Sequence, residues 1–200
     1  MRAWNLGGAA GQMVLAMWCA GMVCSGADPM RRIDFTDSME YPFLAEDTLA
    51  VPEALRWMPN TDVIRVRVRR GRYVFPCEDE PCPALTIDQV NFGKVDGLPG
   101  STAVVTATYH SGGSATWQYL YVESFSSDVA RTVAWLETGS RAYMGLRGVS
   151  FVHGDLVVTV NDPGNRHGDC CSSGTITFRY RWDGSAFVPV GRPEVGRDRE

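Results

Sequence analysis

From residue 63 onward, the chain is a succession of short apolar stretches joined by very brief links. In VIRVRVRRGRYVF (residues 63–75), Ile64, Val66 and Val68 alternate with arginines. This two-residue period is typical of a β-strand with one covered face. Further stretches of the same kind occupy residues 85–92, 101–110, 115–124, 129–137, 147–153, 155–162, 174–182 and 186–190.

The links between these stretches carry the residues of tight turns, as in HSGGS (110–114), HGD (153–155) and DGS (183–185). A parallel pair of strands needs a long crossover, so short links indicate antiparallel neighbours. The sequence therefore predicts a mainly β fold, with a single antiparallel meander sheet or half-barrel over residues 60–190. We expect residues 191–200 to form a flexible charged tail.

Residues 28–59 contain four prolines and no sustained period, which predicts an irregular segment packed on the β domain. One exception is the stretch AEDTLAVPEALRWM, where we expect a short helix starting at Pro52.

The first 27 residues have the pattern of a secretory signal peptide. No charge follows Arg2 within them, residues 13–23 are apolar, and Ala27 ends a run of small residues suited to cleavage. The alternative is an uncleaved anchor, but the glycines of this segment make a poor membrane span. We expect cleavage after Ala27, a periplasmic or secreted protein, and no stable membrane span afterwards.

Charge and motifs narrow the range of activities. With 19 basic against 23 acidic residues, the net charge of −4 gives no general attraction to nucleic acid. No nucleophile elbow, phosphate-binding loop or dinucleotide fingerprint is present. Ser111 beside His110, and Asp155 close to His153, are residue types of a hydrolase, but they lie at expected hairpin tips, where turns favour them. We therefore expect no enzyme and no cofactor.

After signal cleavage four cysteines remain: Cys77, Cys82, Cys170 and Cys171. The last two lie in NRHGDCCSSG (165–174), where His167 suggests a metal site or a thiol nucleophile. Adjacent cysteines are an unusual chelate, and free thiolates do not persist in an oxidising compartment. An even number of cysteines in an exported protein instead indicates disulfides. We expect no metal.

The pairing of these cysteines stays open on the residues alone. Adjacent Cα atoms lie about 3.8 Å apart, below the usual disulfide range of roughly 4.4–6.8 Å, so a Cys170–Cys171 bridge would be strained. A crossed bridge such as Cys82–Cys170 would close a long loop and stabilise the chain by about 4.6 kcal/mol, against about 2 kcal/mol for Cys77–Cys82. On energy alone, the crossed pairing is favoured.

A series of short motifs is spread over residues 92–189: Phe92-Gly93, Ala103-Val104-Val105, Ser111-Gly112-Gly113, residues 138–143 (TGSRAY), Asp162-Pro163, residues 168–174 (GDCCSSG) and residues 179–187 (RYRWDGSAF). In these motifs the chain resembles an uncharacterised family of exported bacterial proteins, often lipoproteins, with a degenerate FG-GAP-like segment. The resemblance implies two local disulfides, because the family pattern has the Cys-Cys pair without an upstream partner pair.

The family's acidic loop resembles a calcium-binding loop, in which acidic oxygens surround the ion. In FGKVDGLPGSTAVV, this chain keeps only Asp96 as a carboxylate, and Lys94 brings the opposite charge. We therefore expect no calcium at this loop.

Two stripes remain as candidate binding surfaces. Arg65, Arg67 and Arg69 share one strand face and form an anion-seeking patch, although such a row is often only a solvated face. Aromatic side chains also alternate along residues 117–121 and 178–182; if exposed, they would stack on sugar rings, but we expect them in the core.

The function that these observations favour is non-catalytic binding of a protein or an anionic envelope polymer. One alternative is a periplasmic inhibitor or immunity protein, which a protruding Cys77–Cys82 loop (PCEDEPCP) would favour. The other is a hydrolase with an unrecognised site, which a cavity lined by titratable groups would favour.

Overall fold

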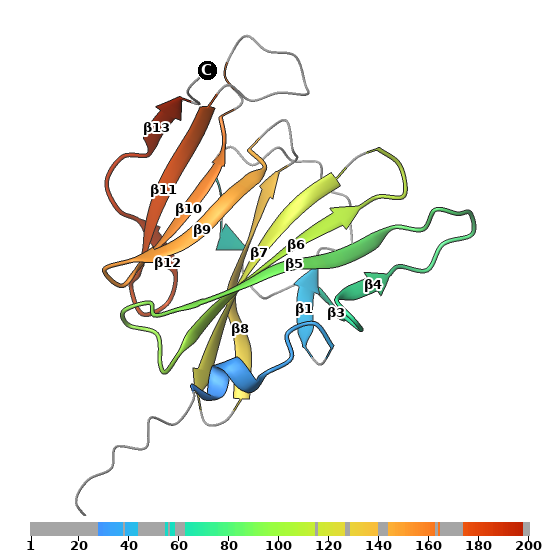
Figure 1. Cartoon of the computed structure of the whole chain (residues 1–200), viewed down its shortest axis with the longest axis horizontal. Coiled ribbons are helices and arrows are strands. Elements are labelled where there is room, and N and C mark those ends of the chain that lie inside the picture. Colours follow the sequence, from blue (N-terminus) through green and yellow to red (C-terminus); the bar gives the residue numbers. More distant parts are fainter. Residues whose placement is uncertain are drawn as a thin grey trace, which may run out of the picture.

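The computed structural model describes residues 28–37, 39–43, 55, 57–58, 63–114, 116–126, 129–139, 144–162, 164 and 174–197. Within them the chain is mainly β, and all strand pairs are antiparallel, which confirms the expected class of fold. The meander is divided between two main sheets, with a two-stranded sheet packed beside them (Figure 1).

The larger sheet has six strands in the order β2-β8-β7-β6-β5-β4. Five of them follow one another along the chain, as short links require. Their bounds are β2 (Trp57–Met58), β4 (Arg72–Val74), β5 (Ala84–Gly93), β6 (Thr102–His110), β7 (Thr116–Ser126) and β8 (Val129–Gly139).

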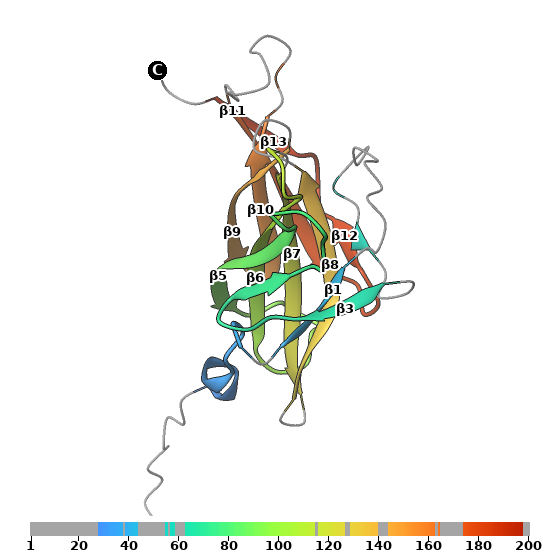
Figure 2. The same ribbon diagram turned by 90° about the vertical axis from the view of Figure 1, so that its right-hand side faces the viewer.

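The second sheet continues the meander. Its strands are β9 (Leu146–Val152), β10 (Asp155–Asn161), β11 (Gly174–Trp182) and β12 (Phe187–Pro189), with β13 (Glu194–Arg197) also paired to β11. The small sheet pairs β1 (Glu40–Phe43) with β3 (Ile64–Arg67), and Figure 2 shows both strands next to β8.

The six-stranded sheet is covered on both faces, so the chain has two hydrophobic cores. The inner core lies between the two main sheets and includes Leu120, Val122 and Leu156. The outer core lies under β1, β3 and the N-terminal segment and includes Tyr121 and Trp135. Because neighbouring residues of β7 enter opposite cores, this strand lacks the alternation of apolar and polar residues that marks a half-exposed strand.

A β-bulge in β8 determines which residues face the outer core. Trp135 pairs with Tyr121 and Ala134 with Val122, but the next pair joins Thr132 to Glu123, which leaves Val133 as an extra residue. Val133 and Ala134 both pack toward the inner core. The extra residue shifts the alternation and brings Thr132 beside Glu123.

The turns agree with the sequence. His153 and Gly154 both have positive φ, 49° and 79°, as a two-residue hairpin between β9 and β10 requires. At the β11–β12 link, the Asp183 carboxylate accepts hydrogen bonds from the backbone N–H groups of Ser185 and Ala186.

A short helical turn near the N-terminus agrees with the expected fold class: it is a 3-10 helix at Pro29–Arg32. The expected helix start at Pro52 lies outside the described residues, and Trp57–Met58 form strand β2. Two other expectations outside the meander need correction. The segment expected to be irregular contributes β1, and the expected flexible tail contributes β13. β13 was not recognised because it is held by backbone pairing with β11, and its Val195 is 68% exposed.

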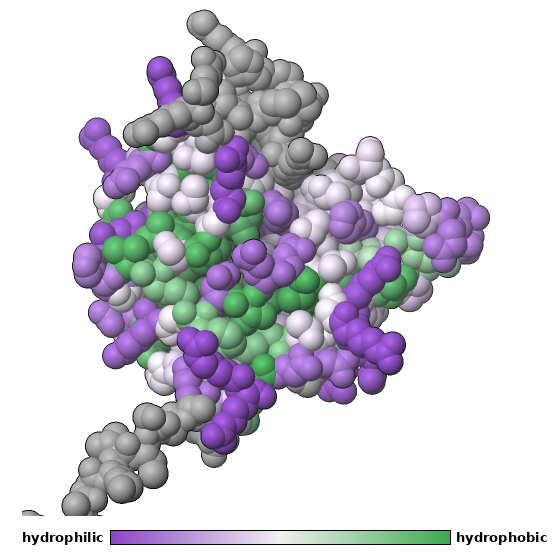
Figure 3. All heavy atoms as spheres, in the orientation of Figure 1, coloured by the Kyte–Doolittle hydropathy of each residue, from purple (hydrophilic) through white to green (hydrophobic). Residues whose placement is uncertain are grey.

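Apolar side chains also gather where the two main sheets meet. Ile87, Val90 and Phe92 of β5 and Val149 and Phe151 of β9 are partly buried, and Figure 3 shows an apolar area over these strands. Gly93 allows the Phe151 ring to lie against the β5 backbone, since a Cβ atom at residue 93 would overlap that ring unless the ring moved. This seam joins the edges of the two sheets.

Asp155, at the start of β10, is the polar anchor of the second sheet. Its side chain is 1% exposed, and its carboxylate accepts hydrogen bonds from Arg181 (2.8 and 3.0 Å) and Arg179 (2.6 Å). Hydrogen bonds from Arg181, then from Arg179, hold the pKa of Asp155 below its usual range. The carboxylate therefore ties β10 to β11 in its ionised form.

Replacing Asp155 with Asn removes the charge and leaves an amide donor facing a guanidinium. Because hydrogen bonds to charged groups contribute roughly 1.5–3 kcal/mol and both arginines are partly exposed, we expect a loss of about 1–2 kcal/mol in the free energy of unfolding at pH 7. The lowered pKa means that this stabilisation is present above the usual aspartate range and is lost as the pH falls below it.

Urea unfolding of the wild type and the Asp155→Asn variant at pH 7 and pH 3 measures both effects, with Asp79→Asn in the exposed loop as the control. The free energies of unfolding of the wild type and Asp155→Asn should differ more at pH 7 than at pH 3. The same difference at both pH values would contradict the proposed ion pair.

Candidate functional site

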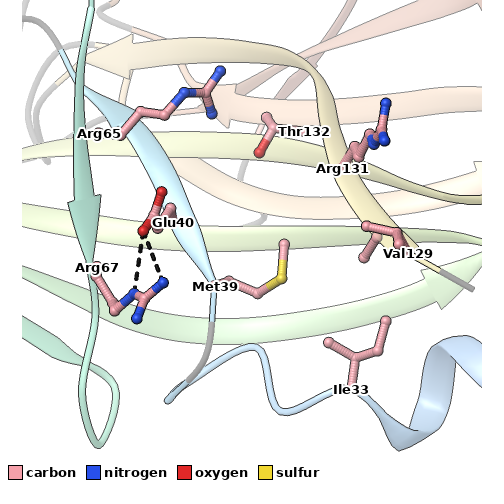
Figure 4. A pocket seen from close by; sticks show the side chains of 9 residues that line it. Ile33, Met39, Glu40, Arg65, Arg67, Val129, Arg131 and Thr132 are labelled. Carbon is pink, nitrogen blue, oxygen red and sulfur yellow. Dashed lines mark hydrogen bonds and ion pairs between the residues drawn. The ribbon is translucent and has the colours of Figure 1, made fainter.

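A cleft of about 620 Å³ lies between β3, the first residues of β8 and the chain that leads into β1. Its walls come from segments far apart in sequence, brought together because β1 and β3 pack against the six-stranded sheet (Figure 4). The residues that line it are Ile33, Met39, Glu40, Arg65, Arg67, Val129, Ala130, Arg131 and Thr132.

Three arginines give the cleft a positive charge. Arg67 forms an ion pair with Glu40, with an Nη2 to Oε1 distance of 2.9 Å. Arg65 and Arg131 form no ion pair with any residue that the structure describes, and they lie on either side of Thr132 in Figure 4. The cleft thus presents two guanidinium groups without an ion-pair partner in the described part of the chain, and guanidinium groups are the side chains best suited to hold a carboxylate or a phosphate.

A carboxyl group is buried behind the cleft wall. The Glu123 side chain is fully buried, and its Oε1 atom accepts a hydrogen bond of 2.7 Å from the hydroxyl of Thr132. Its Oε2 atom is buried without a hydrogen-bond partner in the described part of the chain. Such an unpaired buried group is costly, and groups of this kind cluster at functional sites.

Burial raises the pKa of Glu123 to about 7, although the hydrogen bond from Thr132 and the nearby charge of Arg65 favour the ionised form. Two phenols also lie near it. Burial raises the pKa of both Tyr41 and Tyr121, and the Glu123 charge raises it further. Both phenols therefore stay neutral, so Glu123 is the group here that changes charge near neutral pH.

The arginine row expected from the sequence is divided by the structure. Arg65 and Arg67 line the cleft, whereas Arg69 does not and instead pairs through its backbone with Arg72 across the turn. The alternation of β3 is otherwise as expected, since Val66 and Val68 are buried. The row is therefore a pair of cleft residues followed by an exposed turn.

Arg131 and Glu123 were missed by the sequence reasoning. Arg131 is an isolated arginine in the strand VARTVAWLE, and nothing near it in sequence indicates that it faces Arg65. Glu123 follows three apolar or aromatic residues in a strand otherwise buried on both faces. A glutamate inside such a strand was the one local signal, because burying a carboxyl group costs free energy and therefore indicates a special role for it.

The structure tests only part of the cysteine predictions. Cys77 and Cys82 form a disulfide, with Cα atoms 5.6 Å apart. Cys170, Cys171 and His167 lie outside the described residues, and so does the predicted signal peptide. The acidic residues between Cys77 and Cys82 are all exposed, and Figure 1 shows the β4–β5 link projecting from the sheet.

The residues of the calcium-like loop and of the suspected hydrolase have structural contacts. Asp96 lies against Gly154 at the β9–β10 hairpin. The hydrogen bond and the charge of Asp155 raise the pKa of the Arg181 guanidinium, and the charge of Asp96 raises it further. Both carboxylate oxygens of Asp155 are held by arginines. Within the described ranges, no three His, Cys, Asp or Glu residues are grouped as they would be to bind a metal ion.

The aromatic stripes belong largely to the cores, as expected. Tyr119, Tyr121 and Tyr180 are at most 5% exposed, and Trp117 and Trp182 are partly buried. Tyr121 stacks against Trp135, with ring centroids 6.3 Å apart, beneath the small sheet. Across the residues that the structure places, there is also no helix with the length and apolar character to span a bilayer.

Glu123 makes stability depend on pH in a direction opposite to that of an ordinary paired carboxylate. Its pKa is about 7 in the folded chain against 4.5 when unperturbed, so the folded state holds the proton more tightly. Its contribution to stability is therefore present below pH 4.5 and is lost as the pH rises through about 7. The full change amounts to roughly 3 kcal/mol.

We expect the Glu123→Gln variant to lose this dependence, because glutamine does not titrate. Urea unfolding of both proteins between pH 4 and pH 8 gives the difference between their stabilities, in which the other titrating groups cancel. As the pH rises, the free energy of unfolding of Glu123→Gln should increase relative to that of the wild type. A constant difference over the range would contradict a raised pKa at Glu123.

Comparison with known proteins gives no further indication of what the cleft binds. The sequence matches no protein-family model and no curated protein, and the fold matches no solved structure. What the cleft can bind therefore has to be inferred from its own residues.

Proposed function

We propose that the protein is a non-catalytic exported protein that binds an anionic partner, either a protein or an anionic envelope polymer, through the cleft between β3 and β8. The observation that carries this proposal is the pair Arg65 and Arg131, two guanidinium groups that share one concave site without a described counter-ion. Export rests on the signal-peptide pattern of residues 1–27 and on the resemblance to an exported family.

The chemistry of the lining favours binding over hydrolysis. Guanidinium groups do not release protons at physiological pH, and the carboxylate of Glu40 is held by Arg67. The Thr132 hydroxyl donates to Glu123, but that carboxyl group is fully buried behind it. A hydrolase needs a nucleophile, a base and a donor for the developing oxyanion within reach of one substrate. The cleft instead offers two fixed cations, which suit recognition of an anion.

A second candidate is a periplasmic inhibitor or immunity protein, favoured by the link between β4 and β5. This link is held by the Cys77–Cys82 disulfide and presents three exposed acids, Glu78, Asp79 and Glu80. A constrained, exposed loop is suited to insert into a partner's site, because little conformational entropy is lost on binding. In this reading the partner would be cationic.

Replacing Arg65 and Arg131 together by Ser should weaken retention of the anionic partner by about tenfold at low ionic strength, since each paired charge adds about 1 kcal/mol or less at a partly exposed site. Raising the salt concentration should weaken retention by the wild type in the same way. The matched control is the double variant Arg72→Ser, Arg192→Ser, which makes the same change in net charge at exposed positions outside the cleft.

A pull-down from an envelope extract at low and high salt compares these proteins. Partners retained by the wild type and by the control variant, but lost by the cleft variant, are the expected result. Equal loss from both double variants would mean that only net charge matters, and loss after mutation of the acidic loop instead would favour the inhibitor.

Binding should also weaken as the pH rises from 6 to 8. Glu123 becomes ionised over this range and adds a negative charge beside Arg65, which opposes an incoming anion. In the Glu123→Gln variant, retention of the same partner should not change over this range, which separates the effect from titration of the partner. If retention falls with rising pH equally in the wild type and in Glu123→Gln, the group that titrates is not Glu123.

A further inference from the structure

The cleft has two chemically different sides. Arg65, Thr132 and Arg131 lie along one side, and Met39, Val129 and Ile33 lie along the other, next to the Arg67–Glu40 ion pair (Figure 4). The apolar side chains come from three separate segments: the end of the 3-10 helix, the residue before β1 and the first residue of β8. The cationic and apolar sides thus meet in one concavity, although no local stretch of sequence contains both.

The apolar side is open to a ligand. Val129 is 47% exposed, although most valines of the described strands are buried or partly buried. Ile33 and Met39 are partly buried and contribute to the edge of the outer core. Covering apolar surface of this kind is favourable in proportion to the area removed from water.

The size of the cleft suits a small ligand. Its volume of about 620 Å³ falls within the range of roughly 300–1,000 Å³ that is typical of small-molecule sites. Such sites combine an apolar lining with a few polar groups that fix the orientation of the ligand. Two guanidinium groups without an ion-pair partner among the described residues on one side, and three apolar side chains beside the Arg67–Glu40 pair on the other, correspond to that pattern.

We propose that the cleft takes an amphipathic anion, in which a single carboxylate or phosphate group is attached to an unbranched alkyl chain. The anionic group lies between Arg65 and Arg131, and the alkyl chain lies over Met39, Val129 and Ile33. This rests on the proposed anion-binding function and names the part of the partner that enters the cleft: a free amphiphile, or a lipid that anchors an envelope component.

An acidic peptide fits this lining less well. It would place backbone N–H and C=O groups over Met39 and Val129, whose side chains cannot form hydrogen bonds to them, and burying such groups unpaired is unfavourable. An alkyl chain has no such groups. The apolar side of the cleft therefore favours a lipid-like ligand over a polypeptide.

Calorimetric titration with acetate, hexanoate, octanoate and decanoate tests the proposal, at pH 6, low ionic strength and concentrations below micelle formation. Each methylene group that becomes buried should tighten binding by up to about fourfold, so octanoate should bind at least about tenfold more tightly than acetate. Octyltrimethylammonium, with the same chain and the opposite charge, should bind at least tenfold more weakly than octanoate.

Two variants separate the sides of the cleft. Val129→Ser should reduce the gain from acetate to octanoate while leaving the weak binding of acetate unchanged, and Val195→Ser, at a 68% exposed valine of β13, is its matched control. Arg65→Ser combined with Arg131→Ser should remove the binding of all the carboxylates. Backbone NMR signals of Ala130 and Thr132 should shift on titration and locate the ligand in the cleft.

The possible results distinguish this proposal from the proposed function. Equal affinity for acetate and octanoate, lost in the double arginine variant, would overturn the amphipathic ligand and leave the anion site in place. Octanoate binding that survives the arginine substitutions would overturn the cationic headgroup site. Absence of any carboxylate binding, or tighter binding of a short Asp-Glu peptide than of decanoate, would overturn the proposal.

Flotation with phosphatidylglycerol vesicles identifies the source of the ligand. If octanoate binds, flotation that depends on Arg65 and Arg131 supports a headgroup presented by a bilayer. Absence of flotation with octanoate binding retained supports a free amphiphile.

Discussion

The fold depends on covering both faces of the six-stranded sheet. The central strands β6 and β7 direct alternate residues into two cores, so neither face can be left in water. The second main sheet covers one face, and the small β1–β3 sheet with the N-terminal segment covers the other. The N-terminal segment is therefore part of the folded unit, and the cleft forms at the edge of the layer that it contributes.

The cleft owes its electrostatics to that layered arrangement. Tyr41 of β1 packs on Tyr121 of β7, with ring centroids 4.8 Å apart, and this packing excludes water from the region around Glu123. Arg65 of β3 lies above it and partly offsets the cost of burying the carboxyl group. Glu123 and the arginines proposed to bind an anion thus lie in one environment, so the charge of Glu123 would affect how strongly those arginines attract an anion.

The regular part of the fold was predictable from the sequence, because it depends on local patterns. Alternation in residues 63–75 and turn residues such as His153 and Gly154 identified the meander and its links. β1, β2 and β13 were not identified, since they are short and are held by pairing with distant strands. The division into two sheets was also missed: no local pattern distinguishes a strand that continues one sheet from a strand that begins another.

Only some of the residues that line the cleft could be predicted from the sequence. Arg65 and Arg67 were found because they recur along one strand, whereas Arg131 lies 66 positions from Arg65 and meets it only through packing. The extra residue Val133 of β8 sets Thr132, which lies between the two arginines in Figure 4, beside Glu123. Insertion or loss of a single residue at this point would change which residue of β8 lies beside the buried carboxyl group. In evolution, a partner for a buried carboxyl group can therefore be gained or lost by a change in strand length, without substitution of any residue.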